Sequence, residues 1–125
     1  MKIVNINDLK VIADACGDLK ELYNSENLSL SFSKIEKESK PHKHIKTEEV
    51  YYILKGRAKL KIEEEVFLIK AGDVFSIPKD KYHSVVDVEE VIELVVVTNP
   101  GFDPKDLIYW LYGFILLDFF PVRPW

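Results

Sequence analysis

All three histidines of the chain lie in two short stretches that could form one metal site. His42 and His44 are separated by one residue, so on a β-strand both can project from one face while Lys43 points away. Glu49 can return to them from the next strand, and His83 belongs to the second stretch. Divalent transition metals accept imidazole nitrogen and carboxylate oxygen as ligands. The sequence therefore predicts a metal centre formed by His42, His44, Glu49 and His83.

Each of these residues also has an ordinary interpretation. A single histidine on a strand is more often a partly buried polar residue than a metal ligand. Glu48 competes with Glu49 for the carboxylate position, although alternation along a strand would place Glu48 on the opposite face. Mn, Fe, Co, Ni, Cu and Zn all accept nitrogen together with oxygen, so the identity of the divalent metal stays open. Four protein ligands on a six-coordinate metal would leave about two positions for water, oxygen or a small molecule.

Residues beside these ligands are candidates for proton transfer. If Glu49 points inward, Tyr51 shares its face and could form a wall of the pocket, and Asp87 would share the face of His83 by the same alternation. The candidates for a catalytic acid or base are Tyr51, Tyr82, Asp87 and Glu93. None has a spacing that singles it out, and each is more often a packing or surface residue.

A frame of short strands is expected to hold these residues. Serine alternates with leucine or phenylalanine from residue 28 to residue 33, which is typical of a half-buried strand whose Leu30 and Phe32 could line the pocket. Ile35 breaks the alternation, through either a bulge or an outward position. Further strands are expected at about 49–55, 57–63, 66–70, 74–77, 82–86 and 91–98. Many short strands without helices between them indicate a β-sandwich or β-barrel.

The N-terminal region departs from this pattern of strands and turns. Residues 2–6 could form a short strand. A short helix could follow, capped by Asn7 or Asp8 ahead of Leu9.

The C-terminal tail is strongly apolar. Asp103 and Pro104 could start a helix over about 104–112. No charged residue occurs from position 107 to position 117, so both sides of the segment would be apolar and need covering. We therefore expect a homodimer that uses this tail. The alternative is a tail that lies on a membrane surface, although the segment lacks a basic face.

The two histidine stretches resemble the two sequence motifs of the cupin superfamily. The first motif is matched by His42, His44, Glu49 and Gly56, and the second by Gly72, Pro78 and His83. Asp80 stands where the family usually has glycine, and Asp87 where it usually has asparagine. Aspartate tolerates a left-handed turn, so the turn before His83 can survive. The resemblance implies a small single-domain protein of the cupin 2 type, an all-β, double-stranded jelly-roll β-barrel with short helical segments at its termini.

The resemblance leaves three functions open. A bound metal could activate oxygen, as in the dioxygenases of this fold. It could instead polarise a carbonyl or hydroxyl group, as in related sugar isomerases and lyases. The protein could also be a non-catalytic module that binds a small ligand or senses the metal. Sugar epimerases of this fold that work without metal need a histidine with an aspartate, and no histidine remains once the metal positions are filled.

Composition limits the class of protein further. The 125 residues fit one domain, with a core barrel over about 28–98 and the tail over about 104–125. A net charge of -4 offers no basic field for nucleic acid, and no apolar run reaches the roughly 20 residues of a membrane span. The N-terminus lacks a secretory apolar segment, which favours a cytoplasmic location. The single cysteine, Cys16, cannot form an intramolecular disulfide and is expected to be a small buried residue.

Overall fold

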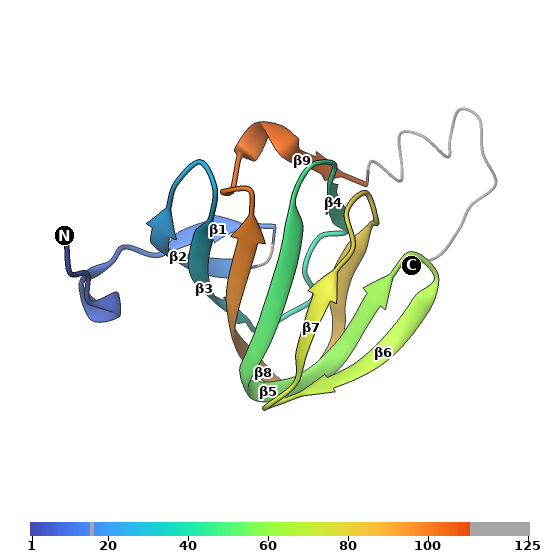
Figure 1. The fold of residues 1–125 in the computed structure, drawn as a ribbon. Coiled ribbons are helices and arrows are strands. Elements are labelled where there is room, and N and C mark those ends of the chain that lie inside the picture. The colour runs from blue at the N-terminus through green and yellow to red at the C-terminus, as the bar shows by residue number, and fades with distance from the viewer. Residues whose placement is uncertain (16, 111–125) are drawn as a thin grey trace.

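The computed structural model of the protein describes residues 1–15 and 17–110, and β-strands make up most of it (Figure 1). The strands are β1 (Ile12–Asp14), β2 (Gly17–Asn24), β3 (Ser29–Ile35), β4 (His42–His44), β5 (Glu48–Ile62), β6 (Glu65–Lys70), β7 (Val74–Ile77), β8 (His83–Asn99) and β9 (Leu107–Tyr109). Two short 3₁₀ turns, η1 (Ile6–Asp8) and η2 (Pro104–Asp106), are the helical elements of the described residues. The expected all-β jelly-roll fold is confirmed.

Two expectations fall on residues that the structure does not describe. They are the burial of Cys16 and the homodimer contact through the tail of about 104–125, of which residues 111–125 lie outside the described part. Both stay predictions. Among the described residues, no helix is long and apolar enough to cross a membrane.

The strands form two layers because β5 and β8 bend and contribute to both. The first part of β5 pairs with the last part of β8, where Glu49 lies opposite Thr98. The last part of β5 pairs with the first part of β8, where Ile62 lies opposite His83. Strands β1, β2, β3 and β7 extend the first layer, whereas β4, β6 and β9 extend the second. The four strands predicted at about 49–55, 57–63, 82–86 and 91–98 are therefore two long bent ones.

The bend of β5 depends on Gly56. Its φ of +98° is one that residues with a side chain rarely adopt. A Cβ at this position would also lie 2.1 Å from the carbonyl oxygen of Val91 on β8. The pairing of the two strands shifts register on both sides of this point. Figure 1 shows β5 and β8 turning back at the end of the molecule opposite β4 and β9.

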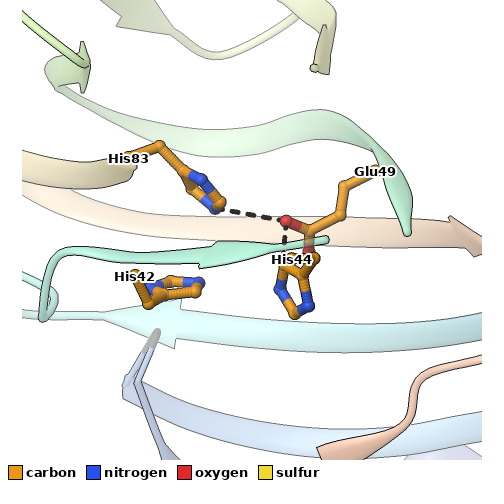
Figure 2. Close-up of side chains that lie close together, drawn as sticks. All are labelled: His42, His44, Glu49 and His83. Carbon is orange, nitrogen blue, oxygen red and sulfur yellow. Dashed lines mark ion pairs between the residues drawn. The ribbon is translucent and has the colours of Figure 1, made fainter. Parts of the chain in front are cut away.

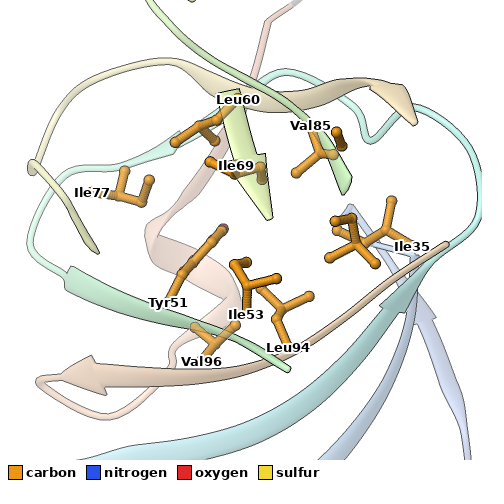
Figure 3. Close-up of a cluster of buried hydrophobic side chains, with 11 residues drawn as sticks. Ile35, Tyr51, Ile53, Leu60, Ile69, Ile77, Val85, Leu94 and Val96 are labelled. Atoms are coloured by element: carbon orange, nitrogen blue, oxygen red, sulfur yellow. The ribbon is translucent and has the colours of Figure 1, made fainter. Parts of the chain in front are cut away.

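Apolar side chains fill the space between the two layers (Figure 3). The cluster consists of Ile35, Tyr51, Ile53, Ala58, Leu60, Ile69, Ile77, Val85, Ile92, Leu94 and Val96. On β5 the buried Tyr51 and Ile53 alternate with the exposed Tyr52 and Leu54, as the sequence predicts. Burial of each large apolar side chain stabilises the fold by about 1.5–3 kcal/mol. The core therefore fixes which face of β5 carries Glu49.

The predicted orientation of β3 is wrong, because its serines face the interior. Ser33 is fully buried, whereas Leu30 and Phe32 lie on the opposite face of the strand and are half-buried. Pairing with β8 is regular up to Ile35, which lies opposite Ile92 without a bulge. Because Ile35 belongs to the core, alternation back along the strand places every serine inside.

The prediction for the N-terminus is also wrong. Residues 2–6 form no strand, and the short helical segment of this region is the 3₁₀ turn η1, which ends at Asp8 and does not continue from Leu9 as predicted. Instead Asn5 caps the short turn η1 by accepting a hydrogen bond from the Asn7 backbone. The following residues form β1 and β2, a hairpin added to the edge of β3.

Within the described residues 104–110, a turn and a strand replace the C-terminal helix that was predicted over about 104–112. Asp103 and Pro104 do start a helical turn, but it ends at Asp106 and β9 follows directly. β9 pairs with the open edge of β4. Pairing of otherwise free backbone groups on that edge favours a strand over a helix here.

Candidate metal centre

The short strand β4 directs the side chains of two histidines into the interior of the protein. His42 and His44 are 1% and 4% exposed. Lys43 lies between them on the outer face, where its Nζ forms an ion pair with Asp80 at 2.8 Å. One edge of β4 pairs with β9, and His42 also lies opposite His83 on β8. The two imidazoles therefore share one face, as expected for alternate residues of a strand.

Glu49 and His83 reach the same point from the two layers. Oε1 of Glu49 lies 3.4 Å from Nε2 of His44 and 3.2 Å from Nε2 of His83 (Figure 2). One potential ligand atom from each of the four residues lies within 4.8 Å of the others. Glu48, the rival carboxylate, is exposed. The buried cluster of His42, His44, Glu49 and His83 could therefore bind a metal ion.

Backbone carbonyl groups orient two of the rings. Nδ1 of His42 lies 2.7 Å from the carbonyl oxygen of Lys40, and Nδ1 of His83 lies 3.0 Å from that of Lys81. A carbonyl oxygen can only accept, so Nδ1 carries the hydrogen in both rings. In a neutral ring of this tautomer, the lone pair is on Nε2. Partners of this kind fix the tautomer and direction of metal-binding histidines.

Burial sets the protonation states of the cluster. Burial, followed by the neighbouring His83, lowers the pKa of His42 from 6.5 to about 4. Burial likewise lowers the pKa of His44. Burial opposes a charge on Glu49, but the surrounding histidines, above all His83, hold its pKa below the usual value. The carboxylate is thus ionised and these two imidazoles are neutral at pH 7, the states that a metal requires.

Three buried atoms of the cluster have no hydrogen-bond partner among the described residues, namely Nδ1 of His44, Oε1 of Glu49 and Nε2 of His83. Buried polar atoms are nearly always paired, and an unpaired one costs about 1–3 kcal/mol. A cation would satisfy Oε1 of Glu49 and Nε2 of His83 at once. Three imidazoles with one carboxylate suit a divalent transition metal better than a soft ion such as Cu(I). The residues present therefore fit a metal ion.

A small cavity opens on one side of the cluster. His42, His44 and Glu49 form part of its wall, and the serines of β3 form another part together with Leu30. Of the two apolar residues expected to line the pocket, Leu30 therefore does so, and Phe32 is not among the described wall residues. The volume of the cavity is ≈ 50 Å³, enough for a few water molecules or the reacting end of a small molecule. Besides Glu49, the described wall residues include two carboxylates, Asp14 and Glu21, and no lysine or arginine.

The predicted acid or base residues do not line this cavity. Tyr51 belongs to the core, with its ring centre 6.4 Å from that of His83. The ring of Tyr82 packs against Lys43, whose Nζ lies 4.7 Å from the ring centre. Tyr51 therefore packs behind the cluster, and Tyr82 packs outside it.

The two predicted carboxylates lie further away. Asp87 was expected on the face of His83, but its φ of +47° breaks the alternation of β8. It forms an ion pair with Lys59 at 3.2 Å, on exposed side chains. Glu93 pairs with Lys55 at 3.9 Å. Neither carboxylate faces the four-residue cluster.

Two polar residues near the cluster were missed by sequence interpretation. The hydroxyl of Ser33 is buried beside the cavity and has no hydrogen-bond partner among the described residues. Asp106 binds the turn that joins His44 to the next strand. The position of Ile35, which breaks the alternation, was the one sequence signal for the inward orientation of Ser33. Asp106 lay within the segment predicted to be a helix, so its contact with the turn was not expected.

Relatives of similar sequence include proteins from two bacteria and an archaeon. The chain is 30% identical over 88 residues to an uncharacterised protein of Aquifex aeolicus, covering 70% of this chain and 73% of that one. It is 33% identical over 66 residues to uncharacterised protein MJ1618 of Methanocaldococcus jannaschii, covering 52% and 53%. It is 33% identical over 60 residues to the pectin degradation protein KdgF of Dickeya dadantii, covering 48% and 54%. The chain thus spans about half the length of two of these relatives.

Solved structures with the same fold have much lower sequence identity. A protein from Planctomyces limnophilus has a TM-score of 0.77 at 19% identity, covering 86% of this chain and 96% of that one. The nucleoside dehydratase Pac13 from Streptomyces has a TM-score of 0.77 at 14% identity, covering 88% and 91%. KdgF from a Halomonas species has a TM-score of 0.63 at 21% identity, covering 70% and 82%.

The family itself follows from the sequence of the barrel. Residues 31–98, more than half of the chain, match the family model described as a cupin domain. This range contains all four residues of the buried cluster and both bent strands of the barrel up to residue 98. The chain is a member of the cupin family.

Proposed function

We propose that the protein is a metal-dependent enzyme that acts on a small, oxygen-rich molecule through Lewis-acid chemistry. The observation that carries the proposal is the four buried donor atoms within 4.8 Å of one another at the wall of a cavity. His42, His44, Glu49 and His83 would hold the metal. When bound, a divalent ion of this type polarises a carbonyl or hydroxyl oxygen of a ligand.

Ser33 would contact the ligand beside the metal. Its hydroxyl can both donate and accept a hydrogen bond, and a ligand oxygen would supply the partner that it lacks among the described residues. Ser29 differs, because its hydroxyl is already bonded to that of Thr98. Ser33 is therefore better suited than Ser29 to orient an incoming hydroxyl or carbonyl group.

The charge of the cavity restricts how a ligand can bind. Asp14 and Glu21 line it, and no lysine or arginine does so within the described residues. A negatively charged group on the ligand would therefore bind at the metal and nowhere else on these walls. A neutral molecule with several hydroxyl groups, or a sugar acid whose carboxylate meets the metal, suits this arrangement.

The relatives favour Lewis-acid chemistry over oxygen activation. One is named a pectin degradation protein, and one fold neighbour is a nucleoside dehydratase. Pectin and nucleosides both contain sugar rings, and a dehydration involves no net oxidation. The dioxygenase hypothesis and the non-catalytic hypothesis are the alternatives.

Elemental analysis and turnover assays test this proposal. Protein purified without a histidine tag or chelator should contain about one divalent transition ion per chain. Wild-type protein and Ser33→Ala would be incubated without oxygen with small uronic acids from pectin and with nucleosides, and conversion followed by NMR. Oxygen-independent conversion that Ser33→Ala slows, with metal content unchanged, supports the proposal.

Other outcomes select the alternatives. Conversion that consumes oxygen in proportion to the product formed would support a dioxygenase. Tight ligand binding without conversion would support a binding module. A protein that takes up no transition metal from any buffer would contradict all metal-dependent versions.

A further inference from the structure

Asp106 is a buried carboxylate that binds a single turn of the chain. It is 8% exposed and lies at the end of η2. Its Oδ1 accepts hydrogen bonds from the backbone of Ile45 at 3.2 Å and of Lys46 at 3.1 Å. Its Oδ2 accepts from the Lys46 backbone at 3.1 Å and from the Thr47 hydroxyl at 2.9 Å. Hydrogen bonds to a charged acceptor are among the stronger ones in proteins.

This turn is the whole connection between the strands that carry two of the clustered residues. β4 ends at His44, and β5 begins at Glu48, one residue before Glu49. Every residue between the two strands donates at least one hydrogen bond to Asp106. The carboxylate therefore determines the path of the chain between the His44 imidazole and the Glu49 carboxylate.

The residues after Asp106 also hold the histidine strand. In β9, Leu107 lies opposite His44, and Tyr109 lies opposite His42. On its other edge, β4 has a single register pair with β8, between His42 and His83. Asp106 and β9 thus hold β4 at its end and along its edge.

A second carboxylate in the same segment provides a comparison. Asp103 accepts one hydrogen bond, from the Lys105 backbone at 2.9 Å, and caps η2. It is exposed and, among the described residues, forms no hydrogen bond with the turn at residues 45–47. Loss of Asp103 would weaken η2 alone, whereas loss of Asp106 would free the turn beside the cluster.

We propose that Asp106 is a positioning residue that sets the separation of His44 and Glu49 and thereby the affinity and geometry of the metal site. The inference rests on the proposed metal binding, but it does not depend on which reaction occurs. Residues that orient metal ligands without touching the metal typically change affinity by about 10–100-fold when replaced. Asp106 acts here on the main chain between two ligands.

The test measures metal binding by Asp106→Asn, with Asp103→Asn as the matched control. Asparagine keeps the size of the side chain but replaces one acceptor oxygen with an amide group that cannot accept. We expect the dissociation constant for Co²⁺, measured by chelator competition, to rise about 10–100-fold in Asp106→Asn. In Asp103→Asn it should stay within about twofold of the wild-type value. At saturating Co²⁺, the visible absorption bands should shift in Asp106→Asn alone.

Thr47→Val provides a second variant if Asp106→Asn does not fold, which circular dichroism would reveal. It removes one of the donors to Asp106, and we expect a smaller rise in the same dissociation constant together with faster amide exchange at Ile45 and Lys46. Unchanged affinity and unchanged bands in Asp106→Asn, or in Thr47→Val if the former is unfolded, would overturn the inference. Failure of the wild-type protein to bind Co²⁺ would instead overturn the proposed function.

Discussion

The clustered residues stand on two very different parts of the sheet. Glu49 and His83 belong to β5 and β8, strands of 15 and 17 residues that pair with each other and surround the core. His42 and His44 belong to β4, a strand of three residues held by β9 and by the turn that Asp106 binds. Half of the donor set is thus fixed by the core of the fold, and half by a short C-terminal segment. Stability and metal affinity should therefore respond to different substitutions.

Removal of one donor from each part should have the largest effect. We expect His44→Ala and His83→Ala each to lose most of their bound metal. Their metal affinity should fall by more than the roughly 100-fold that replacing a residue outside the ligand set costs. Elemental analysis of purified variants measures this. Without metal, His83→Ala should be the less stable, because His83 packs behind the cavity wall and its loss leaves a closed void.

Lys43→Ala is the control for these variants. Lys43 lies between the two histidines of β4 but points outward to Asp80. Its metal content should match that of the wild type. Equal metal content in all three variants would contradict the assignment of the ligands.

Truncation of a core side chain should have the opposite pattern: it should lower stability and leave metal affinity nearly unchanged. Ile53 is fully buried, and Ile53→Ala should lower the free energy of unfolding by about 2–5 kcal/mol. Urea denaturation measures this loss, while the dissociation constant for Co²⁺ should change little in the folded protein. The neighbouring Leu54 is 40% exposed, and Leu54→Ala should cost about 0.5 kcal/mol or less. A large loss of metal affinity in Ile53→Ala would show that the two regions are not separable.

Acid should lower the free energy of unfolding of the metal-free protein, by somewhat less than the largest loss expected for Ile53→Ala. The pKa of His42 is 6.5 in the unfolded chain and about 4 in the folded one, so the unfolded chain alone takes up this proton between those values. Stability therefore falls as pH drops from 6.5 to 4. The difference of 2.5 pKa units corresponds to a loss of at most about 3 kcal/mol. The lowered pKa of Glu49 adds a further loss below pH 4.5.

Urea denaturation at several pH values between 7 and 4 checks this expectation on metal-free protein. His42→Gln should flatten the profile between pH 6.5 and pH 4.5, because glutamine does not titrate. A wild-type stability that is constant over this interval would contradict the burial of a neutral His42. His44 should add to the same trend, since its pKa is also lowered by burial.

The sequence predicts well those features that depend on short-range alternation in strongly apolar strands. The inward face of β5 follows from Tyr51 and Ile53, and the spacing of His42 and His44 places both on one side of a strand. The left-handed turn at Asp80 was also anticipated, and its φ is +58°. These features need no knowledge of which strand lies next to which.

Features that depend on distant partners could not be predicted in this way. The serines of β3 face inward because β8 fixes their register through Ile35, against the apparent preference of the leucines. β9 is a strand because the edge of β4 requires a partner, although Asp103 and Pro104 signal a helix. Asp106 finds its donors some 60 residues earlier in the chain, so no local pattern reveals its role.

The contact between Gly56 and Val91 also bears on how this barrel could be redesigned. Two main chains touch there, and the gap has no room for even a methyl group. The end of the barrel where β5 and β8 bend therefore cannot be widened to hold a larger ligand. Attempts to admit a bulkier compound should target the hairpin β1–β2 and the serine strand β3, which border the opening and lie away from this pinch point.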